Sequence, residues 1–222
     1  MRSLLALALV AIIAPSIAPD VARADGDIYS SATKVSRVED IVWALTASCA
    51  DHGNDTEQRQ CRQLRDARQR ELAQLTMLVE ADATAFSVGA FDAAKKSAQL
   101  SLAACVHCSP IAIEGKSYMV FGGAPRLDGG AVRPPMLHDN TQTFEGAAAH
   151  DAWKKKVASA RVELVVKVPD AAKRPWSAHG KSGLSVDIVG YRVVVPCTGE
   201  IVLAKPASPP VAPDKKSCTV AK

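Results

Sequence analysis

The chain has 222 residues, a formal net charge of +4, 48% hydrophobic and 5% aromatic residues, and six cysteines. This length suits one large domain or two small ones, and the hydrophobic content is sufficient for a packed core. The mild positive charge gives no basis for nucleic acid binding, and the scarcity of aromatic residues argues against a surface that stacks bases or sugars.

The first 24 residues have the three parts of a secretory signal peptide. Arg2 supplies the positive start, residues 4–14 are apolar, and Ala22 and Ala24 occupy the small-residue positions of a cleavage site. A membrane-spanning helix needs about 20 apolar residues, so this shorter run predicts cleavage after Ala24. We therefore expect a periplasmic or extracellular protein that has no membrane span once the signal is removed.

Two helices are predicted within residues 25–80, which we expect to form a helical hairpin. Ser36 and Glu39 have the spacing of a capping box at the start of the first helix, which Gly53 ends. Its apolar residues recur at helical intervals: Val38, Ile41, Val42, Leu45 and Cys49. The second helix begins near Asn54 and reaches about Leu78, with an apolar stripe of Cys61, Leu64, Leu72, Leu75 and Val79. The short link between them predicts antiparallel neighbours.

The six cysteines allow fifteen sets of three disulfides, and export favours the oxidation of all six cysteines. Cys49 lies near the end of the first predicted helix and Cys61 lies early in the second, so the two face each other across the link. We expect disulfides between neighbours in the sequence: Cys49–Cys61, Cys105–Cys108 and Cys197–Cys218.

Short strands are predicted in residues 81–121, where apolar and polar residues alternate. One strand covers residues 98–102, and a second at 111–113 turns at Glu114 and Gly115 into residues 118–121. The next segment, 122–143, is rich in glycine and proline. Because it is longer than an ordinary loop, we expect a surface loop or a linker there.

Residues 144–205 predict a helix followed by a β meander. A helix is expected at 147–158, and the alternation in 162–168 predicts a strand with one buried face. The alternating phase changes near Gly190, which indicates a bulge or turn, and a last strand at 201–204 precedes a proline-rich tail at 206–222. The fold class is therefore α+β: an N-terminal helical hairpin with a mainly antiparallel β-rich body, stapled by disulfides.

The sharpest chemical candidate is the segment from Cys105 to Cys108, with His107 between the two cysteines. A redox-active pair needs a stabilised thiolate, usually at a helix N-terminus, but strand-like sequence follows this segment. Cys105, His107 and Cys108 are also too few for a structural zinc site, and Ser109 stands where a c-type haem motif has histidine. Two cysteines three residues apart can also form a disulfide across a β-turn between strands. In this interpretation Cys105 and Cys108 have a structural role only.

Arg59, Arg62 and Arg65 step along one ridge of the second predicted helix. A weak contact with a phosphate or a polyanionic envelope component through these three arginines is the less favoured interpretation of the ridge. The favoured interpretation is a solvated helix face with local ion pairs, which is the usual meaning of a charge run on a helix.

Two His-Asp pairs invite comparison with metal hydrolases. His138–Asp139 and His150–Asp151 specify no coordination geometry by themselves, and we expect them at the surface, with His150 near a helix start.

Two Gly-Lys-Ser segments, 115–117 and 180–182, resemble the end of a phosphate-binding loop. The earlier glycine that such a loop requires is replaced by Pro110 and Pro175, so neither segment is interpreted as a nucleotide-binding loop.

These observations predict an exported protein with no cofactor and no recognisable catalytic residue: a non-catalytic binding or envelope-accessory module. Two alternatives stay open. One is a thiol–disulfide exchange protein that uses Cys105 and Cys108, and the other is a metal-binding protein that uses Cys105, His107 and Cys108.

Overall fold

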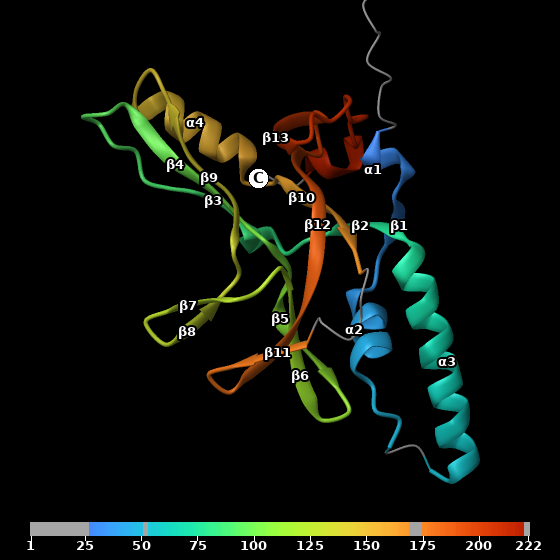
Figure 1. The fold of residues 1–222 in the computed structure, drawn as a ribbon. Helices are drawn as coiled ribbons and strands as arrows, with labels where there is room; N and C mark the ends of the chain where they lie inside the picture. Colours follow the sequence, from blue (N-terminus) through green and yellow to red (C-terminus); the bar gives the residue numbers. More distant parts are fainter. Residues whose placement is uncertain (1–26, 51–52, 169–174, 220–222) are drawn as a thin grey trace, which may run out of the picture.

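A computed structural model describes residues 27–50, 53–168 and 175–219, and the predicted signal peptide lies outside these ranges. The protein is an α+β structure with three disulfides (Figure 1). Within the described ranges, the helices are too short or too polar to cross a membrane. The elements in chain order are α1 Ile28–Ser31, β1 Thr33–Val35, α2 Val38–Thr46, α3 Asp55–Gln74, β2 Thr76–Glu80, η1 Ala83–Ala85, β3 Phe86–Val88, β4 Ser97–Ala103, β5 Cys105–Ile113, β6 Lys116–Gly122, β7 Arg126–Asp128, β8 Ala131–Arg133, β9 Met136–Thr143, α4 Ala147–Val157, β10 Arg161–Lys167, β11 Pro175–Ala178, β12 Lys181–Val195, β13 Glu200–Lys205 and η3 Lys215–Thr219.

The main sheet is organised around the long strand β12. The strand order is β1-β2-β10-β12-β6-β5, and β11 and β13 also pair with β12. The early part of β12 pairs with β6 and β11, and its later part pairs with β10 and β13 (Figure 1). Parallel pairing joins β1 to β2 and β6 to β12, whereas the other pairs in this sheet are antiparallel.

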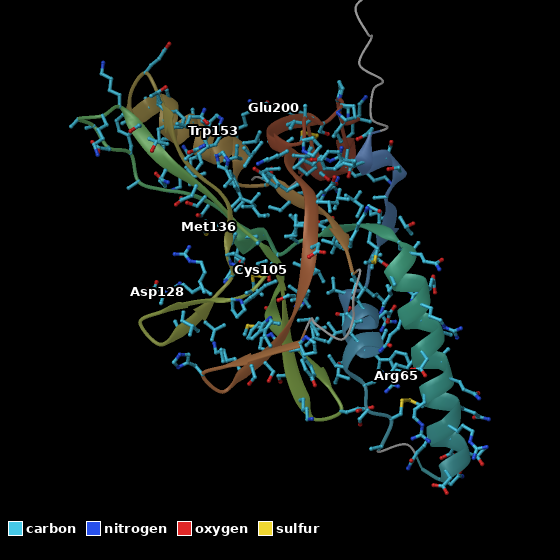
Figure 2. All side chains as sticks on the ribbon, in the orientation of Figure 1. Arg65, Cys105, Asp128, Met136, Trp153 and Glu200 are labelled. Carbon is cyan, nitrogen blue, oxygen red and sulfur yellow. A yellow bond between two sulfur atoms is a disulfide. The ribbon has the colours of Figure 1, made fainter. Side chains whose placement is uncertain are left out.

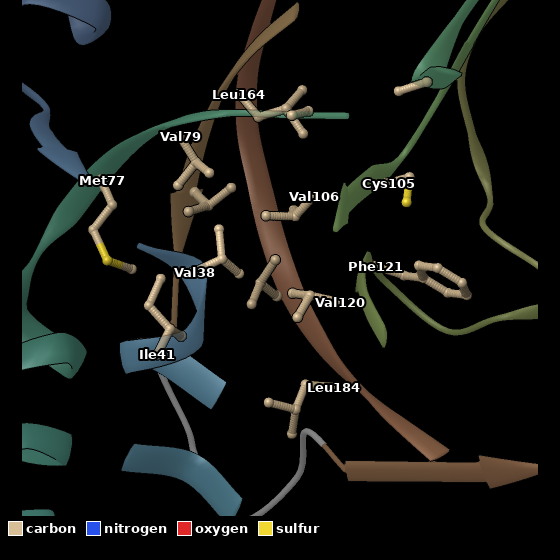
Figure 3. Close-up of a cluster of buried hydrophobic side chains, with 14 of the residues drawn as sticks. Val38, Ile41, Met77, Val79, Cys105, Val106, Val120, Phe121, Leu164 and Leu184 are labelled. Atoms are coloured by element: carbon tan, nitrogen blue, oxygen red, sulfur yellow. The ribbon is translucent and has the colours of Figure 1, made fainter. Parts of the chain in front are cut away.

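The main sheet is rolled, and α2 fills its inside. Val79 of β2 and Val106 of β5 line one pocket although three strands separate β2 from β5 in the sheet order. Val38 and Ile41 of α2 belong to the same buried cluster as Val79, Val106 and residues of β6, β10 and β12 (Figure 3). Burial of this apolar surface is the main stabilising contribution to the fold.

A second, three-stranded sheet, β3-β4-β9, lies at one end of the molecule with α4 alongside it (Figure 1). His150 fastens α4 to this region, because its Nε2 lies 3.1 Å from the carbonyl oxygen of Gly89 and its ring packs between Phe91 and Phe144. The side chain is 3% exposed, so the expected surface position of His150 is wrong.

The helical region differs from the sequence prediction in its boundaries. The capping box of Ser36 and Glu39 does not form: Arg37 precedes α2 and makes no side-chain cap, and α2 ends at Thr46 rather than at Gly53. A capping box does form at the start of α3, between Asn54 and Glu57.

The second helix is also shorter than predicted. It ends at Gln74, and after the single residue Leu75 the chain continues as β2, Thr76–Glu80. The helical spacing of Leu75 and Val79 is overridden because this segment pairs with both β1 and β10, whose ladders supply its backbone hydrogen bonds.

The expected loop at 122–143 is wrong, because most of this segment forms strands. β7 and β8 form a hairpin that turns at Gly129 and Gly130, both with positive φ, and β9 pairs with the whole length of β4. The polar residues of β9 concealed this strand in the sequence.

The expectation that β10 buries one face is also wrong. Residues 162–166 are all buried, since α2 and the core lie on one side and the chain around Tyr29 and Ser208 lies on the other. The bulge predicted near Gly190 lies at Val189, which the register of β10 with β12 skips.

Candidate functional site

Three disulfides join neighbouring cysteines. Cys49–Cys61 clasps the link between α2 and α3, and Cys197–Cys218 holds the C-terminal segment beside the end of β12. Cys105–Cys108 lies inside β5, with 5.6 Å between the Cα atoms, and not in a turn between strands as expected. A wide irregularity in the pairing of β5 with β6 lets the chain bend enough for this bond.

The environment of Cys105–Cys108 differs from that of a catalytic redox pair. Cys105 is fully buried and belongs to the hydrophobic cluster (Figure 3), Cys108 is partly exposed, and a strand rather than a helix N-terminus follows. Nδ1 of His107 lies 2.7 Å from the carbonyl oxygen of Ser109, so the imidazole is held by the backbone.

The predicted metal ligands do not assemble. The two sulfurs are bonded to each other, and in the described parts of the chain no three histidine, cysteine, aspartate or glutamate side chains gather in a way that could hold a metal ion. Asp139 instead accepts hydrogen bonds from Gln99 Nε2 and Ser101 Oγ, both at 2.7 Å, which lower the pKa of its carboxyl group.

The structure brings the two Gly-Lys-Ser segments together. Because β6 and β12 run parallel, with Tyr118 opposite Ser182, the turns that precede both strands lie at the same edge of the sheet. They enclose a pocket of about 270 Å³, which we call the twin-turn pocket. Its lining residues are Pro110, Lys116, Ser117, Met119, Gly180, Lys181 and Ser182.

Both turns have the same backbone geometry. In the hairpin of β5 with β6, Glu114 and Gly115 have φ of 46° and 73°, and in the hairpin of β11 with β12, His179 and Gly180 have φ of 47° and 71°. Positive φ at both central residues of a two-residue loop is the type I′ turn, which matches the twist of antiparallel strands. Each lysine is therefore the first residue of the strand that leaves a rigid turn.

The lining of the twin-turn pocket is positively charged. Lys116 and Lys181 are exposed, Ser117 and Ser182 add hydroxyl donors, and the lining contains no carboxylate. Glu114 is close in sequence, but its carboxylate accepts hydrogen bonds from the backbone amides of Ser48 and Cys49. Ammonium and hydroxyl groups are suitable partners for an oxyanion such as phosphate.

The sequence interpretation of these segments was incomplete. They are not nucleotide-binding loops, because each lysine follows a hairpin turn and begins a strand, whereas the lysine of such a loop precedes a helix. The missed signal was the repetition of one tripeptide, of which only the first copy follows a predicted turn, at Glu114 and Gly115. Only the parallel pairing of β6 with β12 places the two copies together.

A second pocket, of about 510 Å³, lies where the two edges of the rolled sheet approach each other. It carries both signs of charge: Lys34 lies on β1, Glu80 ends β2, Asp82 follows two residues later, and His107 lies on β5. Glu80 is already 3.7 Å from Arg161. This mixture favours no single class of ligand.

The three arginines of the ridge on α3 have different surroundings. Arg65 Nη1 donates to the carbonyl oxygen of Ala47, and its Nη2 pairs with Asp66 at 2.8 Å, so Arg65 turns toward the link before α3 (Figure 2). Arg59 and Arg62 are exposed. The ridge therefore offers two arginines, not three, to an anion.

Comparison with known proteins finds no match that could assign this site: no family model matches the chain, and neither a curated protein nor a solved structure is similar to it.

Proposed function

We propose that the protein is an exported, non-catalytic binding module that holds an oxyanion group of its ligand in the twin-turn pocket. The observation that carries this proposal is the convergence of two Gly-Lys-Ser turns on one pocket without an acidic lining residue. Export and the disulfides fit together, because disulfides persist in oxidising compartments. We further propose that α2 and α3, clasped by Cys49–Cys61, act as a hairpin that supports the β5–β6 turn through Glu114.

The rigid turns favour binding because they hold the backbone of both lysines in place before the ligand arrives. Two-residue type I′ loops have little conformational freedom, so little backbone entropy is lost when Lys116 and Lys181 converge on an anion. Hydrogen bonds to charged groups contribute about 1.5–3 kcal/mol each. Because both lysines are exposed, screening by salt weakens the attraction, and affinity is expected to fall as ionic strength rises.

Calorimetric titration with inorganic phosphate at low ionic strength tests the proposal. The double variant Lys116→Ala/Lys181→Ala is expected to lose at least about tenfold in affinity, which corresponds to about 1.4 kcal/mol. The control is Lys154→Ala/Lys155→Ala, which removes the same charge from the exposed side of α4. Equal loss in both variants would show a general charge effect and would contradict a specific site.

A further inference from the structure

We infer that the Cys105–Cys108 disulfide controls the twin-turn pocket: a dithiol reductant opens it at Cys108, and the pocket then loses affinity for oxyanions. This inference rests on the proposed function and adds its regulation. The disulfide is thereby a target of thiol exchange rather than the catalytic centre of an exchange enzyme.

The first observation is the mismatch in length between β5 and β6. Cys105 pairs with Phe121 and Ile111 pairs with Tyr118, so residues 105–111 lie opposite the much shorter segment 118–121. The register shifts twice within this stretch, on either side of His107. The extra residues of a bulge have no partners on the opposite strand, so few backbone hydrogen bonds hold this part of β5.

The second observation is that the disulfide draws together the two ends of the bulged segment 105–108. It brings the Cα atoms of Cys105 and Cys108 to 5.6 Å, whereas three residues of an ordinary strand span about 10 Å. The covalent bond thus holds the bulge in its contracted shape. Without it, an extended path becomes accessible to residues 105–108.

The third observation connects the bulge to the pocket. Pro110 lines the twin-turn pocket and stands two residues after Cys108 and one before Ile111, where regular pairing with β6 resumes. A change in the path of the bulge therefore moves Pro110. It also loosens the pairing next to Ser117, which lines the same pocket.

The accessibility of the two sulfurs fixes the direction of attack. Cys105 is fully buried, so a reductant reaches only the partly exposed Cys108. A thiolate of the dithiol attacks Cys108 Sγ, the bond to Cys105 breaks, and Cys105 leaves with the electron pair and takes up a proton. The second thiolate of the reductant then displaces Cys108, which is protonated in turn. The reductant ends as a cyclic disulfide, and two electrons have passed to the protein.

The test compares phosphate binding by wild-type protein, Cys105→Ser/Cys108→Ser and the control Cys197→Ser/Cys218→Ser. The control removes a disulfide that does not border the pocket. We expect at least tenfold weaker binding in the first variant and no more than a twofold change in the control. If the first variant binds like the wild type, the inference is overturned while the proposed function stands. A wild-type protein that binds no phosphate overturns the proposed function, and the inference with it.

Two further measurements keep the result interpretable if Cys105→Ser/Cys108→Ser is poorly folded. Wild-type protein is treated with a limiting dithiol, the free thiols are located by alkylation and mass spectrometry, and phosphate binding is expected to fall in proportion to labelling of Cys108. Amide hydrogen exchange in residues 109–118 is expected to become at least tenfold faster in the same sample. Unchanged binding or unchanged exchange at high labelling of Cys108 contradicts the inference.

Discussion

Tyr29 illustrates how much one residue can connect. Its hydroxyl donates to the carbonyl oxygen of Tyr191 at 2.6 Å and lies 3.1 Å from that of Lys205, while the guanidinium of Arg192 stands 4.6 Å above its ring. The residue as a whole is 3% exposed. Through these contacts the first described residues are fixed to β12 and β13.

This environment predicts a stability change at high pH. Burial raises the pKa of Tyr29 to about 12, although Arg192 and the backbone contacts oppose the rise. Between pH 10 and 12 the unfolded chain loses the tyrosine proton and the folded chain keeps it, so its stabilising contribution is complete below pH 10 and declines above it. Tyr29→Phe is expected to weaken this decline in denaturant titrations at pH 8 to 11.5.

The same variant has an effect at neutral pH. Loss of the hydroxyl leaves a buried carbonyl of Tyr191 without this donor, at a cost of about 1–2 kcal/mol. The matched control is Tyr118→Phe, which removes a hydroxyl from a partly exposed position on β6 and is expected to change the free energy of unfolding by less than about 0.5 kcal/mol. Equal stability of Tyr29→Phe and wild type would contradict the assigned role.

Residue patterns in the sequence located some local features and missed others. The capping interaction at Asn54 could be predicted as a helix start, because Asn54 and Glu57 have the required spacing. Ser36 and Glu39 have similar spacing but form no cap, since the chain enters α2 from a strand and Arg37 takes the cap position. Spacing alone cannot distinguish these cases.

At the scale of elements, Glu114 joins the helical region to the β5–β6 hairpin. One carboxylate oxygen accepts from the backbone amide and the hydroxyl of Ser48, both at 2.7 Å, and the other accepts from the amide of Cys49 at 3.1 Å. Cys49 has a positive φ of 60°, which a non-glycine residue adopts only when its surroundings hold it. Glu114 therefore ties the β5–β6 turn to the chain next to the Cys49–Cys61 clasp.

Glu114→Ala is expected to lower the free energy of unfolding by about 2 kcal/mol, because it removes a charged acceptor from three donors. Glu114→Gln keeps one acceptor oxygen and is expected to lose about half as much. Denaturant unfolding measures both. The control Glu145→Ala removes an exposed glutamate and is expected to lose less than about 0.5 kcal/mol; a similar loss in the control would contradict the bridging role of Glu114.

An element could be predicted where its own residues alternate regularly or have typical turn chemistry. Strands β4, β10 and β13 and the β5–β6 turn followed from alternation and turn chemistry. Strand β2 was hidden because its apolar residues continue the helical spacing of α3, and its partners β1 and β10 come from distant parts of the chain. Strand β9 was hidden because it is polar and lies on a small sheet with partly exposed faces.

At the scale of the whole molecule, the parallel pairing of β6 with β12 explains why the sequence did not reveal the candidate site. The twin-turn pocket joins residues 110–119 to residues 180–182, which are adjacent only because β6 and β12 pair in parallel. The α+β class and the use of disulfides followed from composition and pattern. The order of strands could not, since it depends on long-range pairing that a single sequence does not display.

Export and oxidation make a prediction about the intact protein. Purified from its native host, the mature chain is expected to begin at Asp25, and all six cysteines are expected to resist alkylation until a reductant is added. N-terminal sequencing and mass spectrometry of alkylated protein check both. A chain that retains Met1, or free thiols in the native protein, would contradict the account.

The most direct measurement for the central claim is a crystal structure of the oxidised protein grown with phosphate. We expect a tetrahedral anion in the twin-turn pocket, within hydrogen-bond distance of the ammonium groups of Lys116 and Lys181 and of at least one of the hydroxyls of Ser117 and Ser182. Phosphate bound elsewhere on the protein, with the twin-turn pocket empty at a concentration that saturates binding in solution, would contradict it.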